Sequence, residues 1–181
     1  MSEDIFNKHK NYRAFISSEK QLLSTIEWNE NKRPPRTGDK AFLLSRAGAV
    51  RVGTAWRWTL LKIGTECSLF RLFIAYRNDK MQLSVVLGKE LSPRNHLILA
   101  RMEYHPDHPG IHIHGCCEEV SSSAHGRLKY EEMKRFPKAG DYHRMCSLPQ
   151  TDQGILNLVG TKFKIHDLIT IENQLFLDYG V

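Results

Sequence analysis

The stretch LFRLFIAYRNDKMQLSVVL, residues 69–87, decides the fold. Residues 69–76 and 81–87 are rich in aromatic and branched apolar residues, and the polar tetrapeptide Arg77-Asn78-Asp79-Lys80 separates them. Two such segments around a turn-forming tetrapeptide predict a β-hairpin. The first arm is apolar at nearly every position and is expected to be a central strand. The second arm alternates apolar and polar residues, which indicates one wetter face.

Further strands are predicted on both sides of this hairpin. Trp56, Trp58 and Leu60 alternate with polar or smaller residues, and the two tryptophans are expected to pack in the core rather than stack on bases. Residues 96–105 and 111–117 form a second apolar pair around a loop at 106–110. The pattern predicts an α+β fold, a β-rich single domain with a mostly antiparallel sheet or barrel-like meander and a few flanking helices.

The outer parts of the chain are less regular. We expect residues 1–50 to be helical or loop-like, with an amphipathic helix over residues 12–28, and the antiparallel core to span about residues 51–118. We expect residues 119–181 to form a mixed C-terminal part of the same domain, with a short helix over 128–136. A further helix would be capped by Thr151 or Asp152 and would end at Gly160.

Composition narrows the class of protein. Of the 181 residues, 41% are hydrophobic and 25% are charged, which is typical of a folded globular chain. The N-terminus lacks the pattern of a secretory signal and no apolar run is long enough to span a bilayer, so we expect a cytoplasmic protein with no membrane partner. The formal net charge of +6 favours a polyanionic partner such as nucleic acid.

The strongest local signal is YHPDHPGIHIHGCCEE, residues 104–119, which places four of the nine histidines within ten residues. Side chains alternate along a strand, so His112 and His114 are expected to share one face. If the apolar rows of the two strands are buried together, Glu103 and His105 lie beside them. This arrangement predicts a metal site with the ligands His112, His114, His105 and Glu103.

Imidazoles favour transition metals, so the expected cofactor is a divalent ion of Zn, Mn, Fe, Ni or Co. A metal held in this way lowers the pKa of a bound water and polarises a phosphoryl oxygen. His108 and Glu119 are the candidates for proton transfer.

Two basic stretches flank the strands in sequence and could bind phosphates. They contain Lys32, Arg33, Arg36, Arg127, Lys129, Lys134 and Arg135. Together with the histidine cluster, they predict a metal-dependent hydrolase, a nuclease or phosphodiesterase that acts on nucleic acid. An intracellular nuclease of this size would suit a toxin or a defence protein.

Three alternatives stay open. His112-Ile-His114 resembles the signature of the HUH nucleases, the rolling-circle replication nucleases, relaxases and related transposases, and this resemblance implies cleavage of single-stranded DNA through Tyr130. Tyr130 follows His114 more closely than the tyrosine does in those families. His112, His114, Glu119 and Gly126 have the spacing of a cupin motif, which implies a metalloenzyme acting on a small molecule, although no second cupin block surrounds His166. The third alternative is a non-enzymatic binding protein whose histidines are structural.

Overall fold

The predicted hairpin forms the centre of the sheet. The computed structural model describes residues 18–34, 52–66, 68–92, 95–105, 108–116, 133–136 and 148–170. In it, β3 (Ser68–Arg77) pairs antiparallel with β4 (Gln82–Ser92), and Arg77 lies opposite Gln82. Met81 has a positive φ of 47° and belongs to the turn, so the second strand begins one residue later than the alternation predicts.

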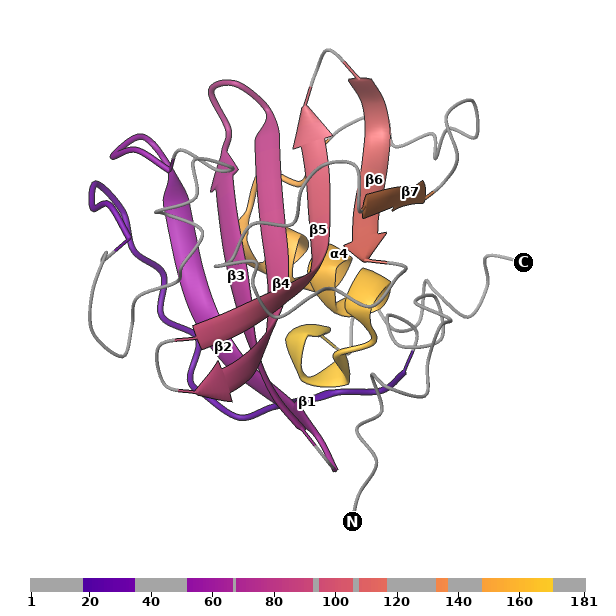
Figure 1. Ribbon diagram of the computed structural model, residues 1–181. Coiled ribbons are helices and arrows are strands. Elements are labelled where there is room, and N and C mark those ends of the chain that lie inside the picture. The colour runs from indigo at the N-terminus through magenta and orange to yellow at the C-terminus, as the bar shows by residue number, and fades with distance from the viewer. Residues whose placement is uncertain are drawn as a thin grey trace.

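The described residues form one sheet whose seven strands follow one another in chain order (Figure 1). All neighbouring strands are antiparallel, and the five strands β2–β6 are the long ones. The bounds of the other strands are β1 Gln21–Leu22, β2 Arg57–Thr65, β5 Asn95–His105, β6 His108–Cys116 and β7 Met133–Phe136. The prediction of a β-rich, mostly antiparallel fold is confirmed to this extent.

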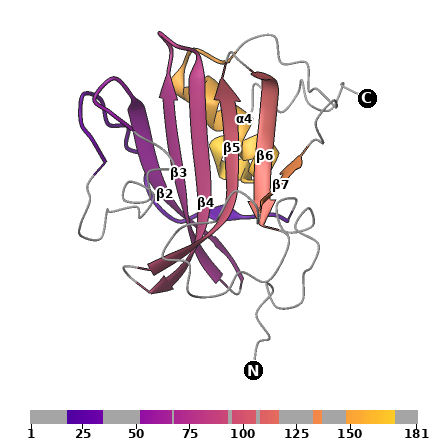
Figure 2. The same ribbon diagram turned by 45° about the horizontal axis from the view of Figure 1, so that its top comes forward.

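The helix α4 (Asp152–Phe163) lies against one face of the sheet, behind the strands in Figure 1 and Figure 2. We call this side the helix face. As predicted, Thr151 is the N-cap, and its hydroxyl accepts a hydrogen bond from the Gly154 backbone N–H at 3.1 Å. None of the helices in the described part of the chain is long and apolar enough to cross a membrane.

Gly160 does not end α4, contrary to the sequence prediction. The helix continues to Phe163, and Lys164 adopts the left-handed conformation that closes it. A Cβ on Gly160 would lie 2.8 Å from the Ile165 carbonyl oxygen. The glycine therefore lets the chain fold back against the helix and enter the short 3₁₀ helix η2 (His166–Leu168).

Apolar side chains are buried on both faces of the sheet. The larger cluster joins the helix face to α4, and its fully buried members include Leu61, Leu72, Met102, Val159 and Phe163. The opposite face carries a smaller cluster of Trp58, Phe73, Ala75 and Val86, against which Trp56 packs. The prediction that the two tryptophans pack in the core is confirmed.

Residues 18–34, which we call the N-terminal strap, are extended rather than helical. Exposure alternates along this segment, with Leu22, Ile26 and Trp28 turned towards the core and Gln21 and Glu27 exposed. This period of two is that of a strand, so the predicted helix over 12–28 is wrong in the part that the structure describes. Residues 12–17 lie outside the described residues.

Hydrogen bonds hold the N-terminal strap along the outer edge of β2. Leu23 N–H donates to the Lys62 carbonyl at 2.8 Å, and Asn29 and Trp58 exchange two backbone hydrogen bonds of 2.8 and 3.0 Å. These partners satisfy backbone groups that an edge strand otherwise presents to other chains.

Lys20 ties the strap to the end of α4. Its side chain is only 3% exposed, and its ammonium donates to the carbonyls of Phe163 at 2.9 Å and Ser18 at 2.7 Å. Burial lowers the pKa of Lys20 to about 8. A lysine at this position satisfies one of the carbonyls that the last turn of a helix leaves without an intrahelical partner.

The helix predicted over residues 128–136 is also wrong where the structure describes it. Residues 133–136 form β7, which pairs antiparallel with β6. The edge of β6 offers four residues of backbone pairing there, and such tertiary pairing overrides the weak local preference for a helix. Residues 128–132 lie outside the described residues.

Candidate functional site

The strands β5 and β6 bring the histidine cluster into register with charged residues. Glu103 lies opposite His112, and Arg101 lies opposite His114. Two residues further along β5, His105 lies opposite His108. We call these six positions, Arg101, Glu103, His105, His108, His112 and His114, the histidine ladder.

The pairing of His105 with His108 depends on a β-bulge. The register shifts by two residues between Glu103 and His105, so β6 has two more residues than β5 in this interval. Pro109 and Gly110 lie in the bulged part of β6, where both residue types are tolerated. The predicted loop over 106–110 is therefore shorter than expected, because β6 already begins at His108.

The ladder positions lie on the face of the sheet opposite α4. Met102, Tyr104 and Ile111 alternate with them and are buried in the cluster that contains the side chains of α4. Because successive residues of a strand point to opposite faces, Arg101 and Glu103 lie on the other side. Partner positions of an antiparallel pair share a face, which extends this assignment to the register positions on β6.

Arg101 and Glu103 form an ion pair between Nη2 and Oε1 along β5. The side chains are 18% and 12% exposed, so most of each is removed from water. In such surroundings the attraction between opposite charges is stronger than at the surface, and the loss of one partner would leave a poorly solvated charge. The pair therefore fixes the carboxylate of Glu103.

The neighbouring strand β4 limits the polar part of this face. Ser84 lies opposite Glu103, and Val86 lies opposite Arg101. Ser84 is 4% exposed, and its buried hydroxyl has no hydrogen-bond partner among the residues that the structure describes. Val86 belongs to the apolar cluster of the opposite face, so the polar surface gives way to an apolar wall within one strand of the ladder.

On the other side, β7 brings a basic residue next to the ladder. Arg135 lies opposite His114, and Lys134 lies opposite Gly115. Arg101, His114 and Arg135 thus occupy one row across three adjacent strands. The sequence pattern places Arg135 among the phosphate-binding candidates but predicts a helix there, so the pattern does not indicate this row.

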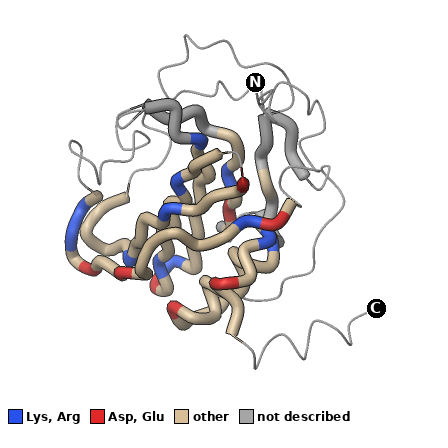
Figure 3. Tube along the Cα trace, turned by 90° about the horizontal axis from the view of Figure 1, so that it is seen from below, with Lys and Arg blue, Asp and Glu red and all other residues tan. Residues whose placement is uncertain are grey.

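The remaining predicted residues are placed only in part. Lys32 and Arg33 are exposed in the strap, and the Lys32 carbonyl accepts a hydrogen bond of 2.7 Å from the Trp58 indole. Figure 3 shows Lys and Arg at several separated points of the described chain. The following predicted residues lie outside the described residues: Arg36, Glu119, Gly126, Arg127, Lys129 and Tyr130.

Of the predicted metal ligands, Glu103 has a described side chain, and the three histidines are placed by their backbone positions. The structure does not describe the side chains of the ladder histidines or of Lys134 and Arg135. Among the described side chains, no three His, Cys, Asp or Glu groups are close enough to hold a metal ion. His166 is exposed on η2, which packs with α4 and β1, and its Nε2 lies 3.6 Å from Glu19 Oε1.

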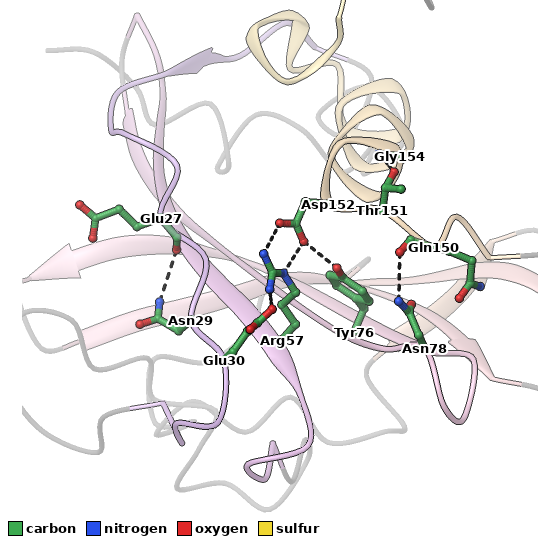
Figure 4. A network of polar contacts seen from close by, with 10 residues as sticks. All are labelled: Glu27, Asn29, Glu30, Arg57, Tyr76, Asn78, Gln150, Thr151, Asp152 and Gly154. Atoms are coloured by element: carbon green, nitrogen blue, oxygen red, sulfur yellow. Dashed lines mark hydrogen bonds and ion pairs between the residues drawn. The ribbon is translucent and has the colours of Figure 1, made fainter.

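A second polar cluster was not predicted from the sequence. The Arg57 guanidinium lies between Asp152 of α4 and Glu30 of the strap, and the Tyr76 hydroxyl donates to Asp152 Oδ1 at 2.6 Å (Figure 4). Burial and then this hydrogen bond raise the pKa of Tyr76. Arg57 also lies over the Trp28 ring, 5.8 Å from its centroid. This network joins the strap, the sheet and α4, and no short motif links residues so far apart in the chain.

No family model, curated protein or solved structure that was searched matches this chain.

Proposed function

We propose that this chain hydrolyses phosphodiester bonds in nucleic acid with the help of a divalent transition metal bound at the histidine ladder. His112 and His114 would be the principal ligands, with His105 or Glu103 completing the set. The metal would be Zn, Mn, Fe, Ni or Co, because neutral imidazoles prefer these ions to magnesium or calcium.

The observation that carries this proposal is the row Arg101, His114 and Arg135. Guanidinium groups repel a metal cation but bind phosphate oxygens strongly and with defined geometry. A row with a histidine between two arginines therefore suits a site where a metal and a phosphate meet. The ion pair with Glu103 offsets one of the two positive charges, which reduces the repulsion of the metal.

The chemistry would follow that of other metal-assisted hydrolases. When bound at the histidine ladder, the metal would supply Lewis acidity for activating water and polarising a phosphoryl oxygen. His108 or Glu119 would carry protons to and from the reacting oxygens. The basic residues Lys32, Arg33, Arg36, Arg127, Lys129, Lys134 and Arg135 would hold the phosphates of the nucleic acid, and this term weakens as salt rises.

The test combines elemental analysis with a cleavage assay on single-stranded DNA, duplex DNA and RNA. The wild-type protein should contain or take up one of the five metals and should cut at least one substrate. The double variant His112→Ala/His114→Ala should lose both properties while its thermal melt stays close to that of wild type, because the two positions lie on the face opposite the α4 core.

His166→Ala is the matched control, because this exposed histidine lies on η2 beside the helix. It should keep the metal and the activity. A wild-type protein that neither contains nor binds metal would exclude the proposal. Metal-dependent turnover of a small molecule, without salt-sensitive binding of nucleic acid, would point to the cupin-like alternative instead.

A further inference from the structure

A carboxylate beside a metal can either bind the ion or hold a metal-binding histidine in place. The ion pair between Arg101 and Glu103 bears on which of these roles Glu103 has. Both residues belong to β5 and are two positions apart, so they lie on the same face of the sheet. Each is the register partner of a different histidine, Glu103 of His112 and Arg101 of His114. The pair therefore sits directly beside the two principal candidate ligands.

A carboxylate that is already held by a guanidinium is a weaker metal ligand. Its charge is largely offset, and at least one of its oxygens is engaged. The same carboxylate remains a good acceptor for an imidazole N–H, because a carboxyl group has two oxygens and about four lone-pair sites. Metal-bound histidines commonly donate their second ring N–H to such a group, which fixes the tautomer and the orientation of the ring.

The neighbour on β4 does not fix Glu103. Ser84 lies opposite Glu103 on that side, yet its buried hydroxyl makes no hydrogen bond among the described residues. Arg101 anchors Glu103 along its own strand, and the other register partner of Glu103 is His112.

We propose that Glu103 is a positioning residue that accepts the ring N–H of His112, that Arg101 holds it in place for this purpose, and that it is not itself a metal ligand. This inference rests on the proposed function for its role at a metal. The contact between Glu103 and His112 stands apart from the metal and can be tested in the metal-free protein.

The first measurement is the ¹⁵N NMR spectrum of the histidine rings in the metal-free, full-length protein. Ring nitrogen shifts report which nitrogen carries the proton. Glu103→Gln should redistribute the tautomers of His112 and leave those of His166 unchanged. Ser84→Ala, at the other register neighbour of Glu103, is the matched control and should change neither. An unchanged His112 in a folded Glu103→Gln protein would overturn the inference.

The second measurement is titration with Zn²⁺ and with Co²⁺, whose visible spectrum reports coordination number. Glu103→Gln should weaken Zn²⁺ binding roughly 10- to 100-fold, the usual effect of losing an outer-shell partner, with an unchanged Co²⁺ spectrum. Arg101→Lys, which keeps the charge, should have a smaller effect. In a double-mutant cycle, the effects of Arg101→Met and Glu103→Gln should be less than additive.

The outcomes distinguish this inference from the proposed function. If wild type binds none of the five metals while Glu103→Gln still shifts His112, the proposed function fails and the positioning contact stands. If wild type binds Zn²⁺ and Glu103→Gln changes the Co²⁺ coordination number, Glu103 is a ligand and this inference fails alone. Circular dichroism of each variant shows whether the fold is kept.

Discussion

Arg57 and Asp152 are joined by two parallel hydrogen bonds of 2.5 Å, one from Nε to Oδ1 and one from Nη2 to Oδ2. The pair links β2 to the first turn of α4, across 95 residues of sequence. Because Glu30 and Tyr76 also contact it, the pair is the centre of a network that holds the strap, the sheet and the helix together (Figure 4).

Loss of the Asp152 charge should destabilise the fold. Asp152→Asn keeps the shape of the side chain but offers a single acceptor oxygen to Arg57 and Tyr76. We expect the free energy of unfolding to fall by roughly 1.5–3 kcal/mol in urea denaturation, the range for a hydrogen bond to a charged group. Asp79→Asn is the control, because Asp79 forms the same kind of pair with Arg77 in an exposed turn. An equal loss in both variants would contradict a special role for Asp152.

Stability should rise with pH because of Lys20. Burial lowers the pKa of Lys20 to about 8 in the folded protein, whereas an unfolded chain keeps this proton until about pH 10.4. Between these values the unfolded state binds more protons, so the free energy of unfolding increases with pH, and below about pH 8 this gain is absent.

Lys20→Met isolates this effect. Lys162, whose pKa burial also lowers, is present in both proteins and cancels in the comparison. We expect wild type to gain stability relative to Lys20→Met as the pH rises from 8 towards about 10. Parallel pH curves for the two proteins would show that Lys20 does not titrate as proposed.

Ser84→Ala should leave the stability unchanged or raise it slightly. The Ser84 hydroxyl is buried without a hydrogen-bond partner among the described residues, so its removal leaves no group unsatisfied. We expect a change between zero and a gain of about 1 kcal/mol. Ala100→Ser is the reverse test, because Ala100 lies opposite the apolar Leu87, is fully buried, and would gain a hydroxyl. It should lose roughly 1–3 kcal/mol, and a clear loss in Ser84→Ala would show that the hydroxyl is bound after all.

Gly160→Ala should be more harmful than Gly64→Ala. A Cβ at Gly160 would lie 2.8 Å from the Ile165 carbonyl oxygen, and Ile165 N–H bonds to the Gly160 carbonyl at 2.9 Å, so relief would require movement of paired backbone. We expect a loss of roughly 1–3 kcal/mol in urea denaturation. At Gly64 the nearest atom is Leu23 Cδ1, the end of a half-exposed side chain that can rotate away. A greater loss at Gly64 would refute this reasoning.

Tyr130→Phe should keep most of the cleavage activity. In the proposed mechanism the nucleophile would be water rather than a side chain, so no covalent bond to a tyrosine would form. The check is a cleavage assay together with denaturing electrophoresis of protein and labelled DNA. A protein–DNA adduct that disappears in Tyr130→Phe would replace the proposed mechanism by that of the HUH nucleases.

The sheet was predictable where pairing is local. In the β3–β4 hairpin, dense apolar residues and a short polar turn specify both strands, and only Met81 departs from the pattern. The ladder pairs Glu103–His112 and Arg101–His114 follow from burial of Met102 and Ile113 between them. The pairing of His105 with His108 required the bulge, which the alternation alone does not indicate.

The elements predicted wrongly owe their structure to distant partners. The strap is extended because β2, Phe163 and Asp167 receive its hydrogen bonds, and a helix would forfeit all of them. β7 is a strand because the edge of β6 is beside it. Arg135 lies opposite His114 because β7 pairs with this edge. Local pattern carries no information about such partners, so the candidate site was predictable on β5 and β6 but not on β7.

The contacts of Lys20 also set the order in which the chain can assemble. Lys20 meets Phe163 and Leu22 meets Asp167, across 143 and 145 residues, whereas the strands β2–β6 each pair with the next strand along the chain. Contacts that close long loops form late. On the ribosome, Lys20 and Leu22 can make these contacts only after residues 163–167 have emerged. The strap can pair with the outer edge of β2 before then, through Leu23 with Lys62 and Asn29 with Trp58, so this edge is protected while Lys20 still waits for its partner in α4.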